Sequence, residues 1–211
     1  LEKLNKEREV IGLYLSAHPL DDYKVIIRNM CKTQVGDLDH LDELKGKEIA
    51  VAGMVVAVQN LTTKTGKPWG KFKLEDYNGA HEFALFGKDY ENFRKYLFAD
   101  YFLFVRGKVQ PKPYNDQELE FKIIAMTQLA EMRDSIKEMC VQLPVEEVTE
   151  SLIRDLTDRV RESKGDTLLR LNVFDREAHV SVNLFSKSHK VTLSQALVDY
   201  LDENEIKYSI A

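Results

Sequence analysis

The stretch with the clearest chemistry lies between Asn60 and Lys73, because it contains four lysines and the only tryptophan but no acidic residue. Its functional side chains are Lys64, Lys67, Trp69, Lys71 and Lys73. Sites for single-stranded nucleic acid combine cations, which bind phosphates, with aromatic faces, on which any base can stack. We therefore expect this stretch to contact single-stranded nucleic acid. No paired Arg or Asn stands out as a reader of base edges, so sequence-specific recognition is not expected.

Alternating residue types arrange these side chains along a strand. Trp69, Lys71 and Lys73 fall on one face, whereas Phe72 and Leu74 fall on the other. In the next strand His81, Phe83 and Leu85 share a face, which we predict to be the second half of the binding platform. Structural alternatives remain open: Trp69 as a plug at the barrel end, Phe83 as a core residue, and the lysines as a solvated edge-strand face.

A second loop supplies the opposite side of the expected site. Gln110–Asp116 offers Lys112 and Tyr114 between two predicted strands. The full set of candidate nucleic-acid-binding residues is Lys64, Lys67, Trp69, Lys71, Lys73, Phe83, Lys112 and Tyr114.

Five predicted strands position these residues. They cover residues 47–58, 69–76, 81–86, 100–109 and 118–125, with a helix over 88–98. The first is apolar on both alternating faces, as in a barrel wall, and Asn78-Gly79 predicts a two-residue hairpin turn. Five strands with a helix between the third and fourth are the layout of the oligonucleotide- and oligosaccharide-binding (OB) barrel.

The barrel is flanked by two further segments. Residues 1–30 are predicted to form two helices around a break, with Leu4, Val10, Ile11 and Leu15 on one face of the first, and residues 33–45 are predicted to be an acidic connector. Residues 131–211 read as a small α+β domain. Its first predicted helix ends at Gly165-Asp166 and has one apolar face, formed by Val145, Val148, Leu152, Leu156 and Val160. Strands are predicted over 167–174 and 178–185, followed by a helix capped by Ser194 and a last strand over 206–210. The fold class is thus α+β, mainly β in the centre, with domains 1–45, 46–130 and 131–211.

Charge limits the kind of partner. The 211 residues carry a net charge of −5, with 44% hydrophobic and 31% charged residues, so the chain can bury a core. Residues 46–140 carry fourteen basic and thirteen acidic residues, whereas the flanking segments are acidic. One basic strip in an acidic protein indicates a single anionic contact rather than a polycation.

Cellular location follows from the cysteines and the hydropathy. Cys31 and Cys140 are far apart and lack ligand spacing, so we expect two free thiols in a reducing cytoplasm. No apolar run has the length of about 18 residues that a membrane span needs, and no signal peptide is present. The chain begins at Leu1 rather than Met, which favours a fragment of a longer protein.

No catalytic constellation is visible. Acidic residues are scattered rather than clustered around metal ions. His18 precedes Pro19 and has no second ligand at metal spacing, so we expect a hydrogen-bonded structural histidine. We expect no cofactor in this chain.

The segment from Glu7 to Leu20 contains the pattern G-x-Y-x-S-x-H-P-L. It resembles the segment that leads out of the polymerase body in the bacterial replicative DNA polymerase III alpha subunit. Barrel motifs also resemble that family: Val51-Ala-Gly-Met-Val, Thr63-Lys-Thr-Gly-Lys-Pro, Leu74-Glu-Asp-Tyr-Asn-Gly, Leu85-Phe86 and Val105-Arg-Gly-Lys-Val. The resemblance extends to the end of the chain but weakens after Glu138.

The resemblance implies a different role for each domain. The barrel would bind single-stranded template DNA, and the last domain would dock to the clamp-loader tau subunit and the replisome. The catalytic carboxylates and their Mg²⁺ would lie upstream, so this part would be inert while its parent is a nucleotidyltransferase, a DNA-directed DNA polymerase. Two alternatives remain: the anticodon-binding barrel of a tRNA synthetase, which would prefer RNA loops, and an OB scaffold that binds protein.

Overall fold

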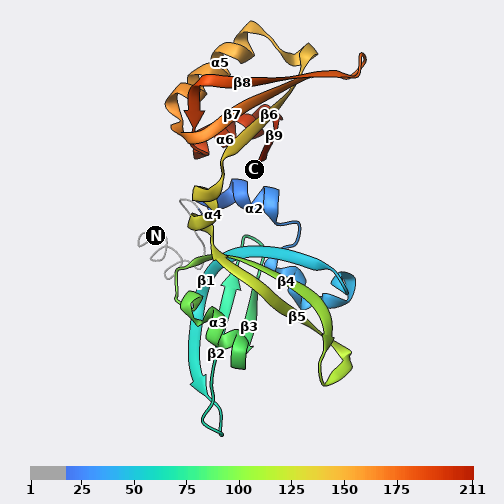
Figure 1. The fold of residues 1–211 in the computed structure, drawn as a ribbon, viewed down its shortest axis with the longest axis vertical. Helices are drawn as coiled ribbons and strands as arrows, with labels where there is room; N and C mark the ends of the chain where they lie inside the picture. Colours follow the sequence, from blue (N-terminus) through green and yellow to red (C-terminus); the bar gives the residue numbers. More distant parts are fainter. Residues whose placement is uncertain (1–17) are drawn as a thin grey trace. The chain divides into compact units, whose positions relative to one another are not determined.

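A computed structural model describes residues 18–211, which divide into one unit that ends at Arg133 and a second that begins at Asp134 (Figure 1). The predicted helical face at Leu4 to Leu15 lies outside the described residues. The described helices of the first unit are η1 (Asp21–Tyr23), α2 (Lys24–Met30), η2 (Val35–Asp39), η3 (Leu41–Leu44), α3 (Gly87–Phe93) and η4 (Arg94–Tyr96), where η marks a 3₁₀ helix, and α4 (Leu129–Ser135) follows its last strand. The strands are β1 (Glu48–Thr62), β2 (Pro68–Glu75), β3 (Ala80–Phe86), β4 (Phe102–Lys112) and β5 (Asn115–Gln128).

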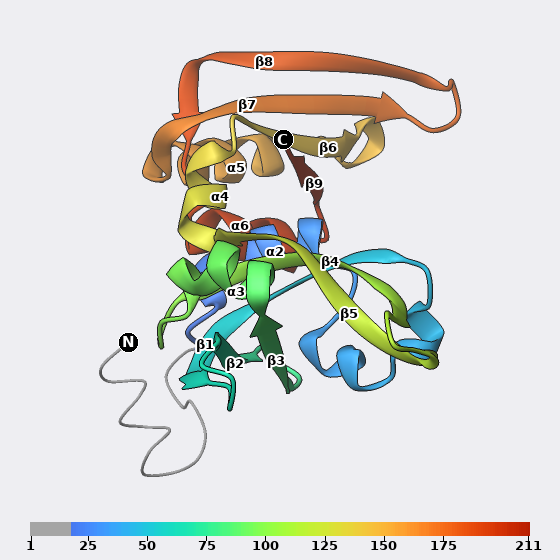
Figure 2. The same cartoon turned by 60° about the horizontal axis from the view of Figure 1, so that its bottom comes forward.

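The five strands form one antiparallel sheet in the order β3-β2-β1-β4-β5, which confirms the predicted OB layout (Figure 2). The long strand β1 pairs with β4 through its first half and with β2 through its second half. Gly53 lies at this crossing, where a Cβ atom would stand 2.5 Å from the carbonyl oxygen of Glu75. Only glycine allows the two backbones to approach so closely.

A single core fills the inside of this sheet. The middle of β1, Val51 to Val55, is buried on both faces as predicted. Although β3 and β5 share no ladder, the rings of Phe83 and Phe121 meet across the gap at 6.0 Å. The curved sheet therefore closes around its core as a barrel.

The turn between β2 and β3 differs from the predicted two-residue hairpin, because neither Asn78 nor Gly79 has a positive φ. The Asp76 carboxylate instead accepts hydrogen bonds from the backbone N–H groups of Asn78 and Gly79, each at 2.9 Å. A local side-chain acceptor of this kind shapes a longer turn without left-handed residues. The prediction of a two-residue turn with positive φ at Asn78 and Gly79 was wrong for that reason.

The same carboxylate holds the connector against the barrel. Its second oxygen accepts the N–H of Val35 at 2.7 Å. A Cβ on Gly79 would stand 3.1 Å from the Cα of Gly36, so the turn and the connector touch through their backbones. Burial, with a further contribution from the Asp76 charge, raises the pKa of the nearby Cys31 thiol to about 12. Both cysteines are free thiols, as predicted.

His18 and Leu20, the described end of the S-x-H-P-L segment, also pack on this turn. The His18 ring lies 4.3 Å from the Tyr77 ring, and its Nδ1 accepts the N–H of Leu20 at 3.2 Å. The Tyr77 hydroxyl donates to Asp21 at 3.0 Å; burial and this hydrogen bond raise the pKa of Tyr77. His18 is therefore the hydrogen-bonded structural histidine that the sequence predicted.

The second unit contains a four-stranded sheet in the order β8-β7-β6-β9, in which β6 and β7 are parallel. Its elements are β6 (Glu138–Pro144), η5 (Val145–Glu147), α5 (Glu150–Glu162), β7 (Lys164–Asp175), β8 (Val180–Val191), α6 (Gln195–Glu203) and β9 (Lys207–Ile210). Both long helices pack on one face of this sheet, where Leu156 and Leu201 join Met139, Val141 and Leu169.

Helix α5 differs from its prediction at both ends. The Thr149 side chain caps it by accepting the N–H of Leu152, so Val145 lies outside the helix. Gly165 and Asp166 belong to β7 instead of ending the helix. The predicted Ser194 cap of α6 is confirmed, since its side chain accepts the N–H of Leu197 at 3.3 Å.

Replacing Asp76 with alanine will destabilise the barrel, because the buried N–H group of Val35 and those of the turn lose their acceptor. We expect a loss of about 3 kcal/mol in the free energy of unfolding, measured by urea denaturation with fluorescence of Trp69, the only tryptophan. The control is Asp116→Ala, an exposed carboxylate in the β4–β5 hairpin. Equal midpoints for the two variants would contradict this role.

Candidate nucleic-acid interface

The outer face of β2 carries the side chains that the sequence placed together. Along the strand the buried residues Gly70, Phe72 and Leu74 alternate with Trp69, Lys71 and Lys73. The predicted division between a core face and a solvent face of β2 is therefore confirmed.

The predicted contribution of β3 was wrong. The register pairs Phe72 with Phe83 and Leu74 with His81, and residues directly opposite each other share a face of a sheet. The Phe72 and Phe83 rings stack at 4.9 Å, and only 5% of Phe83 is exposed. Phe83 and Leu85 thus form core rather than platform, and His81 binds Asp39 of η2 at 2.8 Å.

The β3 residue that does join the platform is Phe86, which the sequence analysis did not select. It lies opposite Trp69, and the two rings stack at 4.8 Å with an interplanar angle of 14°. Phe86 is 55% exposed, and on the other side of Trp69 lies Leu61 of β1, 36% exposed. We call the stacked pair Trp69 and Phe86, which Leu61 flanks, the aromatic row. The alternation of β3 contained this signal, because Phe86 has the opposite parity to the buried Phe83.

Trp69 does not plug the end of the barrel. Trp69 is not part of the core cluster of the first unit and stacks outside it on an exposed ring. The exposed Phe86 ring can therefore extend the Trp69–Phe86 stack to a flat group such as a base. Offset stacking of this kind is the geometry that aromatic groups favour.

Four lysines surround the row with unequal freedom. Lys64 and Lys67 are exposed on the β1–β2 loop, which is shaped by the Thr63 hydroxyl accepting the N–H of Lys67 at 3.0 Å. Lys73 is also exposed, whereas Lys71 forms an ion pair with Glu82 at 3.0 Å. Phosphate would thus meet three lysines without an ion-pair partner among residues 18–211 and one that is already paired.

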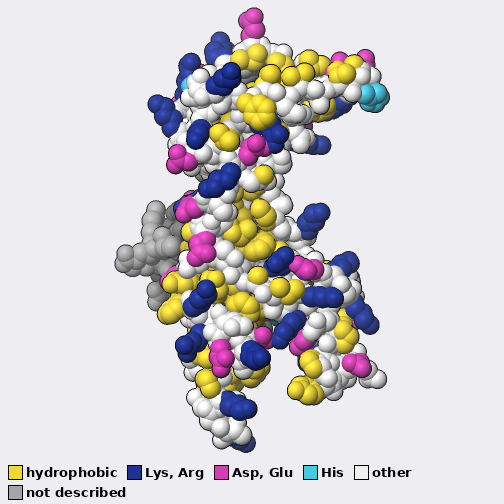
Figure 3. Space-filling model, in the orientation of Figure 1, with side chains coloured by type: hydrophobic (Ala, Val, Ile, Leu, Met, Phe, Trp, Pro, Cys, Tyr) yellow, Lys and Arg dark blue, Asp and Glu magenta, His cyan; other side chains and the backbone are white. Residues whose placement is uncertain are grey.

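The β4–β5 hairpin places Lys112 and Tyr114 on a separate projection. Figure 3 shows this hairpin and the β1–β2 hairpin as two protrusions with an open notch between them. Tyr114 is fully exposed. Lys112 donates to Glu118 at 2.5 Å, a bond that raises the pKa of Lys112 and lowers the pKa of Glu118. Tyr114 is thus available to a ligand, while the charge of Lys112 is already compensated.

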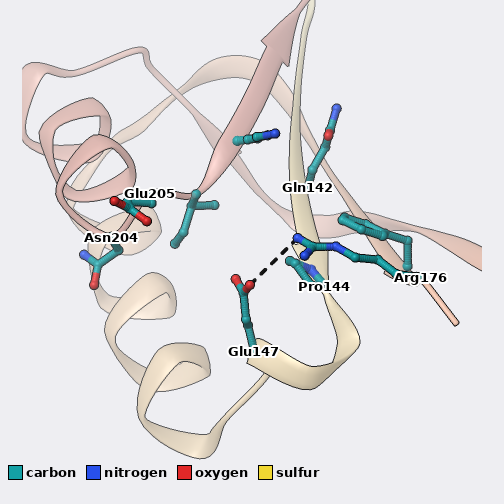
Figure 4. Close-up of a pocket in the computed structure, with 9 residues that line it drawn as sticks. Gln142, Pro144, Glu147, Arg176, Asn204 and Glu205 are labelled. Atoms are coloured by element: carbon teal, nitrogen blue, oxygen red, sulfur yellow. Dashed lines mark ion pairs between the residues drawn. The ribbon is translucent and has the colours of Figure 1, made fainter.

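The second unit contains a different kind of hollow, of about 920 Å³, shown in Figure 4. Arg176 lies beside Pro144 and points toward Glu147, with 4.0 Å between the charged groups. Lys207 and Glu205 also line the hollow. Its charges balance, so it offers no net attraction to an anion.

Two features are absent from residues 18–211. No group of three or more His, Cys, Asp or Glu side chains is placed to hold a metal ion. No helix in this part of the chain is long and apolar enough to cross a membrane.

The sheet and its exposed face define an OB-fold domain, and residues 49–129 match the family model described as "OB-fold nucleic acid binding domain". Residues 139–211 match the model described as "DNA polymerase III alpha subunit, C-terminal domain". The chain is thus similar to the C-terminal region of DNA polymerase III alpha subunits, and the resemblance inferred from its motifs is confirmed.

Curated relatives carry the same name, DNA polymerase III subunit alpha. The protein from Haemophilus influenzae is 30% identical over 81% of this chain and 14% of its own length. The Escherichia coli K12 protein is 28% identical over 94% and 17%, and that of Saccharopolyspora erythraea is 34% identical over 53% and 9%. The chain therefore spans only a small part of these relatives.

Proposed function

We propose that the barrel binds single-stranded DNA without sequence preference, as part of a replicative DNA polymerase. The observation that carries the proposal is the aromatic row beside Lys64, Lys67 and Lys73 on the outer face of the sheet. Stacking accepts any base, and lysines bind the phosphates that every sequence shares. The OB-fold family match and the names of the relatives support the same role.

The proposal divides tasks between this chain and its parent protein. The barrel holds the template strand. The polymerase reaction, which the name of the relatives states, would use Mg²⁺ ions and catalytic carboxylates in sequence outside this chain. The chain itself contributes binding and no catalysis. We further propose that residues 134–211 dock the polymerase to the clamp-loader tau subunit and so to the replisome, as the resemblance to the alpha subunit implies.

Neutralising the loop lysines will weaken binding in a salt-dependent way. Each engaged lysine contributes about −0.7 to the slope of log affinity against log salt for a single strand. Wild type with three free lysines should therefore give a slope of about −2, and Lys64→Ala/Lys67→Ala should reduce it to about −0.7. The measurement is fluorescence anisotropy of a labelled, mixed-sequence oligonucleotide over a salt series.

The matched control for the lysines is Lys164→Ala, an exposed lysine in the second unit. It should leave both affinity and slope unchanged. An unaltered slope in the double variant would refute the barrel as the binding site. Tighter binding of a structured RNA loop than of DNA would favour the anticodon-binding alternative instead.

Removing an aromatic side chain from the row will lower affinity without changing the salt slope, because stacking releases no counterions. Phe86→Ala should cost about 1–3 kcal/mol, or roughly 5- to 150-fold in the dissociation constant. Phe98→Ala is a matched control, since Phe98 is a phenylalanine of the same unit with 54% exposure. Equal losses from both variants would show that the row has no special role.

The docking role predicts a ternary complex. The full chain should bind purified tau subunit in size-exclusion chromatography and should still bind labelled single-stranded DNA, because the two contacts use different units. Lys64→Ala/Lys67→Ala should reduce DNA binding and leave tau binding intact. Competition between DNA and tau, or no complex at micromolar concentrations, would contradict the proposed docking.

A further inference from the structure

The second unit ends its sheet in an open edge. β8 is the outermost strand and pairs with β7 along one side, and no other strand among residues 18–211 pairs with its outer side. An edge of this kind presents a row of backbone N–H and C=O groups to any extended chain. Soluble proteins usually guard such edges with charged residues or proline. From Val180 to Phe185 the edge contains neither.

The same segment exposes apolar side chains at alternating positions. The register pairs Leu184 with Leu171 and Val182 with Val173, which places them on the face that α5 and α6 cover elsewhere. Beyond that cover, Val180, Val182 and Leu184 are 59%, 58% and 49% exposed. We call these three residues the β8 strip. Figure 3 shows hydrophobic side chains running along this hairpin.

Charge indicates what kind of chain would occupy the edge. Residues 134–211 contain ten basic and fifteen acidic residues, yet from Ala178 to Val198 there are two lysines and no acidic residue. Lys187 and Lys190 both lie on β8 and are exposed. Like charges directly opposite each other destabilise a strand pair, so a partner strand with basic residues at these positions would be disfavoured. An acidic strand is complementary to the two lysines.

We propose that the edge of β8 docks an extended acidic segment of a partner protein, which adds a fifth strand to the sheet. Main-chain hydrogen bonds to β8 supply affinity, and alternating apolar residues of the partner pack beside the β8 strip. Its acidic residues lie near Lys187 and Lys190. The inference rests on the proposed docking role of this unit, for which it names the surface and the chemistry of the partner.

The test uses the full chain and three labelled 12-residue peptides. One alternates Glu and Val, one alternates Lys and Val, and one alternates Glu and Ser, which removes the apolar side chains and keeps the acidic charge. The Glu–Val peptide should bind saturably in anisotropy and protect the amides of residues 180–185 from hydrogen exchange. The other two should bind at least about tenfold more weakly, a difference of about 1.4 kcal/mol. No saturation, or equal binding of all three, would overturn the proposal.

Matched variants locate the contact. Val182→Lys places a charge in the β8 strip and should weaken the Glu–Val peptide at least about tenfold. Ser181→Lys adds the same charge on the same exposed strand but on the opposite face, and should not weaken it. Thermal unfolding midpoints near that of wild type will show that both fold, as expected for exposed positions. Equal affinity of both variants would refute the strip.

Three outcomes distinguish this inference from its alternatives. Concentration-dependent dimerisation in sedimentation that Val182→Lys abolishes would assign the edge to a second copy of the chain and overturn the acidic partner. If Val182→Lys retains full binding of the tau subunit, the docking role stands and the assignment of β8 as its surface fails. Loss of tau binding in Val182→Lys but not in Ser181→Lys would support both the docking role and the assignment of β8 as its surface.

Discussion

The Asp76 carboxylate is the contact on which the first unit depends. It accepts backbone N–H groups from the β2–β3 turn and from the connector, so it fixes two segments with one charged group. Hydrogen bonds to an ionised acceptor are stronger than neutral ones. The turn that it shapes sets the register of β2 against β3. A slip of one residue would exchange the core and solvent faces of a strand.

That register creates the proposed DNA-binding surface. With Phe72 opposite Phe83, both rings fill the core, and Trp69 meets Phe86 outside it. Free cations among the candidate residues are fewer than the sequence suggests, because Glu82 pairs with Lys71 beside the stack and Glu118 pairs with Lys112 on the β4–β5 hairpin. Electrostatic attraction at the proposed surface is therefore limited, and stacking would have a correspondingly larger share. Such a balance suits a site that must hold a strand of any sequence and release it.

The second unit is organised by incomplete cover of a sheet. Its helices bury the inner face of the central strands, where Met139 and Val141 are almost fully hidden, but they leave the outer part of β8 bare. A folded unit that exposes an edge segment without charge or proline, Val180 to Phe185, and an apolar strip on it keeps them at a cost in solubility. A partner strand would remove that cost, and the local lysines indicate its charge.

Sequence alone determined the element order, because alternating apolar residues in β1 to β5, the Ser194 cap and the S-x-H-P-L motif are local signals. It also selected Trp69 and its neighbouring lysines, since their parity along one strand is local too. Only the tertiary structure decided which β3 residues share their face, because that depends on pairing between strands and on a turn shaped by a side chain. For this reason Phe83 lies in the core, where the sequence predicted a surface residue, and Phe86 lies on the surface. Ion pairs that neutralise Lys71 and Lys112, and the open edge of β8, likewise arise from which segments meet in space.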